Sequence, residues 1–81
     1  MRCFFNLSGS VIDPDDEGAE IASLAEARLE AVRDLSICLR DEPHLVWQGE
    51  ELRMDVTDHN RMILCTVIVL GIDAPAAMPL R

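Results

Sequence analysis

The sequence predicts an α+β domain in which a four-stranded antiparallel sheet carries one helix on one face, in the order ββαββ. Residues 52–58 alternate apolar and polar side chains, which is typical of a strand with one buried face. Residues 24–39 instead repeat their apolar side chains every three or four positions, as an amphipathic helix does. Because strand-forming segments lie on both sides of this helix, a sheet covered by the helix buries both apolar surfaces most simply.

The first two strands are expected in residues 3–12. Residues 3–7 form a short apolar run, and the Ser-Gly-Ser sequence at 8–10 is typical of a turn. Val11 and Ile12 then return as the second strand of a hairpin. An acidic loop follows at residues 13–18, where proline and glycine oppose regular structure.

The helix has a clear start and a clear end. Ser23 is placed as the N-cap, and Glu26 completes a capping box three residues later. The helix ends by Glu42, because Pro43 disfavours a helical residue before it. This gives a helix of about 18 residues. Its core-facing positions are Leu24, Ala27, Ala31, Leu35 and Cys38, widened by Val32 and Leu39.

A second hairpin is expected in the last third of the domain. The turn falls within residues 58–61, with Asn60 able to adopt a left-handed backbone, and residues 62–70 return as a strand. A turn of even length fixes the register of this hairpin. Three pairs then share the helix-covered face: Val56 with Ile63, Met54 with Cys65, and Leu52 with Val67.

Four segments carry a resemblance to a known family: Arg2–Leu7 (RCFFNL), Asp16–Ile21 (DEGAEI), Leu24–Arg28 (LAEAR) and Val56–Asp58 (VTD). Over residues 2–70 the chain resembles a family of small bacterial domains of unknown function. The resemblance implies the strand-strand-helix-strand-strand architecture and no catalytic residue. The last hairpin departs from the family pattern, because Asn60 and Arg61 stand where a glycine is expected.

Composition and charge restrict the class of protein. The 81 residues suffice for one domain, at 1–70, and the segment 71–81, which is rich in alanine and proline, is expected to be a loosely ordered tail. A formal charge of −8 opposes binding to nucleic acid or to anionic lipid. The longest apolar run, 62–70, is too short to cross a membrane, and the N-terminus lacks a signal-peptide core. We therefore expect a cytoplasmic protein that binds neither nucleic acid nor a membrane.

The sequence offers few candidates for catalysis or metal binding. Residues 13–18 match the first half of an EF-hand loop, but its twelfth position, which requires a carboxylate, is Leu24. His44 and His59 have no further ligand at the spacing of a metal site, and the three cysteines form no C-x-x-C pair. We expect no catalytic residue, metal or cofactor. The alternative is a small enzyme or metal-dependent domain that uses His59 and nearby acids.

Binding to proteins is therefore the expected function, as a stand-alone interaction or regulatory domain with an unidentified protein partner. Trp47 is one candidate contact, because tryptophan is favoured at the centre of interfaces. The alternative for Trp47 is that it folds back and caps the small core.

A homodimer is also expected, built on the sheet face away from the helix. The predicted register leaves an apolar patch on that face, and such a patch marks an association surface on a soluble protein. Its residues are Met62, Leu64, Ile68 and Leu70. The alternative is that Met78 and Leu80 of the tail fold over this patch.

Overall fold

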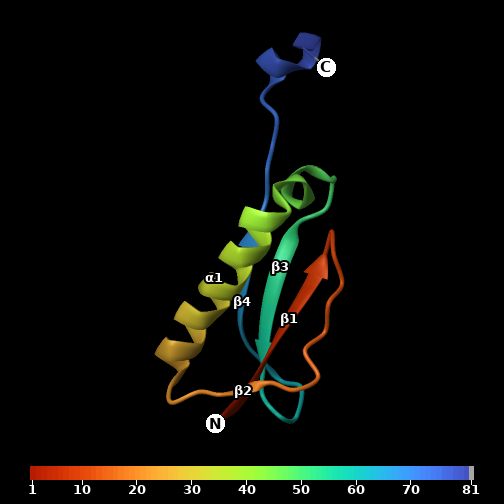
Figure 1. Ribbon diagram of the computed structural model, residues 1–81. Helices are drawn as coiled ribbons and strands as arrows, with labels where there is room; N and C mark the ends of the chain where they lie inside the picture. Colours follow the sequence, from red (N-terminus) through yellow and green to blue (C-terminus); the bar gives the residue numbers. More distant parts are fainter. Residues whose placement is uncertain (81) are drawn as a thin grey trace.

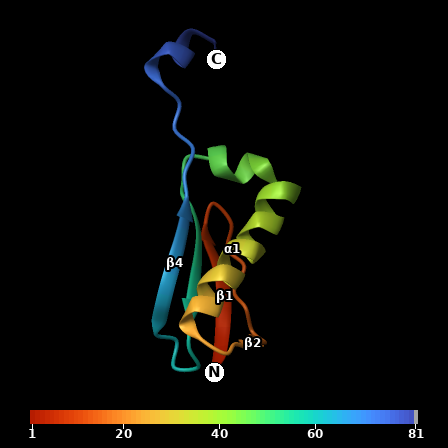
Figure 2. The ribbon, with the colours of Figure 1, turned by 90° about the vertical axis from the view of Figure 1, so that its left-hand side faces the viewer.

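The computed structural model describes residues 1–80 and confirms the ββαββ architecture (Figure 1). All strand pairs are antiparallel, in the order β2-β1-β3-β4, and the helix covers one face of the sheet (Figure 2). We call the opposite face the outer face. The elements are β1 (Arg2–Gly9), β2 (Ala19–Glu20), α1 (Leu24–Asp41), β3 (Leu52–Thr57) and β4 (Ile63–Val69), with two short 3-10 segments, η1 (Pro43–Trp47) and η2 (Pro75–Leu80).

The first hairpin differs from the prediction. Val11 and Ile12 form no strand, and Ile12 is 80% exposed. The second strand is β2, which pairs with Arg2 and Cys3, while Asp13 forms a single bridge to Leu7. Between these two contacts the chain follows the edge of β1 without regular pairing. There the Asp15 carboxylate, and not a backbone carbonyl, accepts the hydrogen bond of Phe5 N–H.

The register of the second hairpin is also different from the predicted one. Val56 pairs with Cys65, Met54 with Val67, and Leu52 with Val69, so each β3 residue meets a β4 residue two positions later than expected. The physical reason is a longer turn. The Asp58 carboxylate accepts hydrogen bonds from the backbone N–H groups of Asn60 and Met62, at 2.8 and 3.0 Å, and Asp58 N–H donates to the Met62 carbonyl.

The same turn changes the position of two further side chains. The left-handed backbone belongs to Arg61 (φ 64°) and not to Asn60. The register shifts between Val56 and Thr57, so that Thr57 pairs with Ile63 and Leu64 is the extra residue of a bulge. Leu64 is half-buried against the core, and its predicted position on the outer face is therefore wrong.

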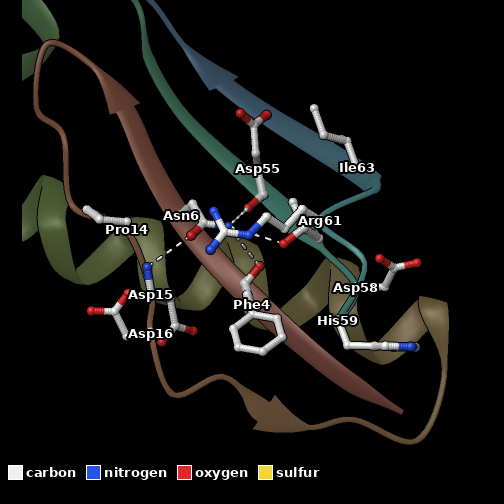
Figure 3. A pocket seen from close by; sticks show the side chains of 11 residues that line it. Phe4, Asn6, Pro14, Asp15, Asp16, Asp55, Asp58, His59, Arg61 and Ile63 are labelled. Atoms are coloured by element: carbon white, nitrogen blue, oxygen red, sulfur yellow. Dashed lines mark hydrogen bonds between the residues drawn. The ribbon is translucent and has the colours of Figure 1, made fainter.

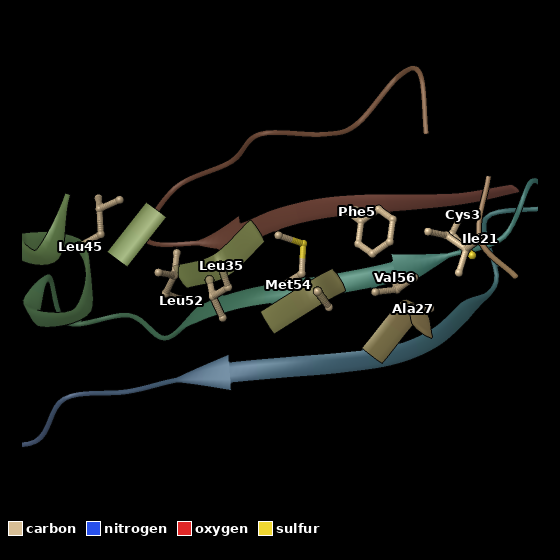
Figure 4. Packing of buried hydrophobic residues seen from close by; sticks show 10 residues of the cluster. Cys3, Phe5, Ile21, Ala27, Leu35, Leu45, Leu52, Met54 and Val56 are labelled. Atoms are coloured by element: carbon tan, nitrogen blue, oxygen red, sulfur yellow. The ribbon is translucent and has the colours of Figure 1, made fainter. Parts of the chain in front are cut away.

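The core lies between α1 and the sheet (Figure 4). The helix contributes two fully buried alanines, which allow it to approach the sheet closely, whereas Leu24 and Val32 are 38% and 50% exposed despite the prediction. The predicted inward positions of β3 are confirmed, and Leu45 of η1 closes one end. The buried set is Cys3, Phe5, Ile21, Ala27, Ala31, Leu35, Leu45, Leu52, Met54 and Val56.

Ser23 caps the helix as predicted. Its hydroxyl accepts a hydrogen bond from Glu26 N–H at 3.1 Å, and the Glu26 carboxylate accepts one from Ala22 N–H at 3.3 Å. We expect Ser23→Ala to lower the free energy of unfolding by about 0.5–2 kcal/mol, as measured by urea denaturation. Ser36→Ala is the control, because this mid-helix hydroxyl only donates back to Val32. Equal stability of the two variants would contradict the capping role.

The C-terminal segment lies away from the sheet. Figure 1 shows η2 beyond the end of the domain, and Met78 and Leu80 are 54% and 85% exposed. The alternative in which these two residues cover the outer face is therefore wrong. The loosely ordered tail at 71–81 stays a prediction, and its last residue, Arg81, lies outside the described residues.

Candidate functional site

A hollow of about 550 Å³ lies on the outer face of the sheet (Figure 3). Its floor is formed by side chains of β1, β3 and β4, one wall by the 14–16 segment, and the other wall by the turn after β3. The lining residues are Phe4, Asn6, Asp55, Thr57 and Ile63 on the floor, Pro14, Asp15 and Asp16 on one wall, and Asp58, His59 and Arg61 on the other. We call it the outer-face hollow.

Asp15 holds the first wall against the edge of β1. Its carboxylate accepts hydrogen bonds from the backbone N–H groups of Phe5, Glu17 and Gly18, at 3.1, 3.1 and 3.0 Å. Its own N–H donates to the Asn6 side chain at 2.9 Å. Burial acts to raise the pKa of Asp15, but the three N–H donors outweigh it and place this pKa below its ordinary value.

Asp55 is similarly engaged on the floor of the hollow. Its Oδ1 accepts hydrogen bonds from the Thr66 hydroxyl at 2.7 Å and from the Arg53 guanidinium at 3.0 Å. Partial burial acts to raise the pKa of Asp55, and these two donors lower it to a net value below the ordinary one. Asp15 and Asp55 are therefore occupied by structural hydrogen bonds.

The hollow does bring His59 together with the acids that the enzymatic or metal-dependent alternative requires. His59 and Asp58 stand on one wall, and Asp16 stands on the other (Figure 3). Among residues 1–80, however, no three histidine, cysteine or acidic side chains form a group that could hold a metal ion. His44 lies on η1 and does not line the hollow. Within residues 1–80, no hydrogen bond or ion pair joins the His59 side chain to an acid of the hollow.

Four of the five candidate interface residues are exposed. Ile68 and Leu70 are each 53% exposed, Met62 is 64% exposed in the turn, and Trp47 is 61% exposed on η1. The fifth, Leu64, is half-buried on the helix side. The predicted patch on the outer face therefore lacks Leu64, and Asp55 there is hydrogen-bonded to the neighbouring Arg53 and Thr66 side chains.

Trp47 does not cap the core, because Leu45 performs that role at 6% exposure. The indole of Trp47 lies against the backbone of Gly71, where a Cβ atom would stand 2.7 Å from the ring. A shallow hollow of about 420 Å³ follows this contact, and its lining includes Val46 and Leu70. One side of the indole therefore remains available at the surface.

Asp34 of α1, which is close enough to the 13–18 loop to feel the charge of Asp15, has an unusually high pKa. Burial, the charge and hydrogen bond of Glu30, and the charge of Asp15 raise the pKa of Asp34 from 3.8 to about 6. A carboxyl group whose pKa is raised in the folded state binds its proton more strongly there than in the unfolded chain. Its contribution to stability is therefore present below about pH 4 and is lost as the pH rises through about 6.

We accordingly expect Asp34→Asn to raise the free energy of unfolding at neutral pH, by an amount on the order of 1 kcal/mol or less because solvent screens the charges. The gain over wild type should disappear at about pH 4. Urea denaturation at several pH values measures both. Glu50→Gln, which removes one charge from an exposed loop, is the control. A gain for Asp34→Asn that does not vary with pH would contradict the assignment.

The fold and these surfaces define a small α+β domain with an acid-lined hollow on its outer face and exposed apolar residues along its last strand. The chain belongs to the family described as Domain of unknown function (DUF6894), whose model matches residues 2–71. No curated protein and no solved structure gave a match. Within residues 1–80, the structure contains no helix with the length and apolar character needed to cross a membrane.

Proposed function

We propose that this chain is a protein-interaction domain that acts as a homodimer. The observation that carries the proposal is the exposure of large apolar side chains along β4 and its continuation. Ile63, Ile68, Leu70 and Ile72 are 59%, 53%, 53% and 78% exposed. Such a series of exposed apolar side chains on a chain with a formal charge of −8 favours an association surface.

Charge also favours association through these residues. β4 contains no aspartate, glutamate, lysine, arginine or histidine, whereas fifteen aspartates and glutamates are distributed over the rest of the chain. Two negatively charged copies repel each other least where acidic residues are scarce. A twofold dimer is the commonest arrangement for a soluble oligomer, which is why a second copy is the first partner to test.

Size-exclusion chromatography with light scattering, from low to high micromolar concentrations, tests the proposal. We expect a molar mass twice that of one chain at the high end. A single-chain mass over the whole range would overturn the homodimer.

Trp47 is proposed as the contact for a further protein partner. Trp47→Ala should leave the melting temperature nearly unchanged, because the ring is largely exposed and Leu45 closes the core. A large loss of stability would contradict this role and would indicate that the Trp47–Gly71 contact is structural.

A further inference from the structure

We propose that the edge of β4 pairs antiparallel with the β4 edge of a second copy, which joins two four-stranded sheets into one eight-stranded sheet. The pairing extends over Cys65–Val69 with the twofold axis at Val67, so that Cys65 lies opposite Val69 of the second copy. This inference rests on the proposed homodimer and specifies its interface.

The two edges of the sheet differ in whether another segment covers them. The outer edge of β1 is covered in succession by β2, by the Asp15 carboxylate on Phe5 N–H, and by the Asp13 bridge to Leu7. β4 is the last strand on the other side, and no described segment pairs with its free edge. An uncovered edge leaves a row of backbone donors and acceptors that can pair with another strand.

β4 also lacks the features that protect natural edge strands from pairing. Its sequence, Ile-Leu-Cys-Thr-Val-Ile-Val, contains neither a charged residue nor a proline. The bulge lies at its beginning, at Leu64, so the stretch from Cys65 to Val69 is paired regularly with β3. This regular stretch is the part able to accept a further strand.

The helix-facing side chains of β4 are incompletely covered. Cys65, Val67 and Val69 pack against the core but remain partly exposed, whereas Leu52, Met54 and Val56 on the neighbouring strand are at most 2% exposed. The core thus ends at β4 without a covering element. A strand added at this edge, with apolar residues on its helix side, would extend the core across the junction between the two β4 strands, which we call the seam.

The helix surface nearest the seam adds little negative charge. Asp34 interacts with Asp15 of the loop along β1, so the flank of α1 that carries Asp34 faces away from β4. The opposite flank faces β4, and at helical spacing its first turns carry Ala25, Leu29 and Val32, with Arg28 as the one charged residue. Leu29 and Val32 are 58% and 50% exposed. A second acidic copy can approach from this side without bringing acids of the two helices together.

A second copy fits this edge better than an unrelated extended peptide. The added strand must place apolar side chains opposite Cys65, Val67 and Val69, and β4 itself meets this condition when it is turned by a twofold axis at Val67. The pairs are then Cys65 with Val69 and Val67 with Val67 on the helix side, and Thr66 with Ile68 on the outer face. Every residue thus meets one from the same face.

Cysteine crosslinking tests the pairing. In Val69→Cys the new thiol would lie directly opposite the native Cys65 of the second copy, within reach of a disulfide. Within one chain the two residues are four positions apart along a strand, roughly 13 Å, and cannot be joined. We expect oxidised glutathione to produce a covalent dimer, and peptide mass mapping to identify a link between positions 65 and 69.

Ile68→Cys is the matched control, because Ile68 precedes Val69 on the same strand, is more exposed, and points to the outer face. It should give no link to Cys65. A single-chain mass at all concentrations would overturn both this inference and the proposed homodimer. A dimer in which Val69→Cys forms no link, or links no better than Ile68→Cys, would overturn the edge pairing and leave a homodimer built on another surface.

Discussion

Gly9→Ala is expected to unfold most of the protein. Gly9 ends β1 with φ 88°, and a Cβ atom at this position would stand 1.8 Å from the carbonyl oxygen of Glu51. That oxygen cannot move aside easily, because it accepts a hydrogen bond from Ser10 N–H at 3.1 Å and precedes the paired residue Leu52. A left-handed backbone and a steric clash together cost about 3–5 kcal/mol, which is comparable to the whole stability of a domain of this size.

Gly49→Ala is the matched control for this clash. Gly49 has nearly the same backbone angle, φ 87°, but no atom lies within 4 Å of the position that its Cβ would take. Its loss should be about 1 kcal/mol, from backbone strain alone. Urea denaturation followed by the fluorescence of Trp47 compares the two variants. An equal loss at both positions would mean that the approach of Glu51 to Gly9 is unimportant.

Much of the fold follows from local sequence rules. The helix bounds are set by a cap at Ser23 and by Pro43, which act within a few residues of themselves. The buried face of β3 follows from alternation, and Leu52, Met54 and Val56 are at most 2% exposed as expected. These features depend on residues that are close in sequence and not on contacts between distant segments.

The errors arose where one polar side chain reorganises several backbone groups. Asp58 binds two N–H groups of its own turn and lengthens it, which moves the register of the second hairpin by two residues. The Asp15 carboxylate likewise accepts the hydrogen bond of Phe5 N–H, where the predicted hairpin would place the backbone of a second strand. Aspartate followed three residues later by glycine, as in Asp15–Gly18, was the available signal for the second case, since aspartate side chains commonly bind nearby backbone N–H groups in turns.

The outer-face hollow was not predicted for the same reason. Its two walls, at 14–16 and 58–61, are far apart in sequence and meet only because β1 and β3 are neighbours in the sheet. No periodic pattern reports that adjacency. Leu64 was misplaced because the predicted register put it on the outer face, whereas the bulge turns it toward the core.

Asp15→Ala is expected to cost about 2–3 kcal/mol, because it leaves the N–H groups of Phe5, Glu17 and Gly18 without their acceptor. Asp16→Ala removes an acid from the adjacent exposed position, which makes none of these bonds, and should change stability by less than about 0.5 kcal/mol. Urea denaturation at neutral pH measures both. Similar losses in the two variants would show that loop charge, and not the Asp15 hydrogen bonds, sets the effect.

Asp15→Asn separates the charge from the shape of the side chain. Asp15 Oδ1 accepts from Glu17 and Gly18, and Oδ2 accepts from Phe5. An amide keeps one accepting oxygen but would present an NH₂ donor to a third N–H donor, so we expect an intermediate loss of about 1–2 kcal/mol. Because the pKa of Asp15 is lowered by folding, its contribution is present above the unfolded value of 3.8 and is lost as the pH falls below it. The difference between wild type and Asp15→Asn should therefore shrink in acid, and a difference that stays constant there would contradict the role of the carboxylate charge.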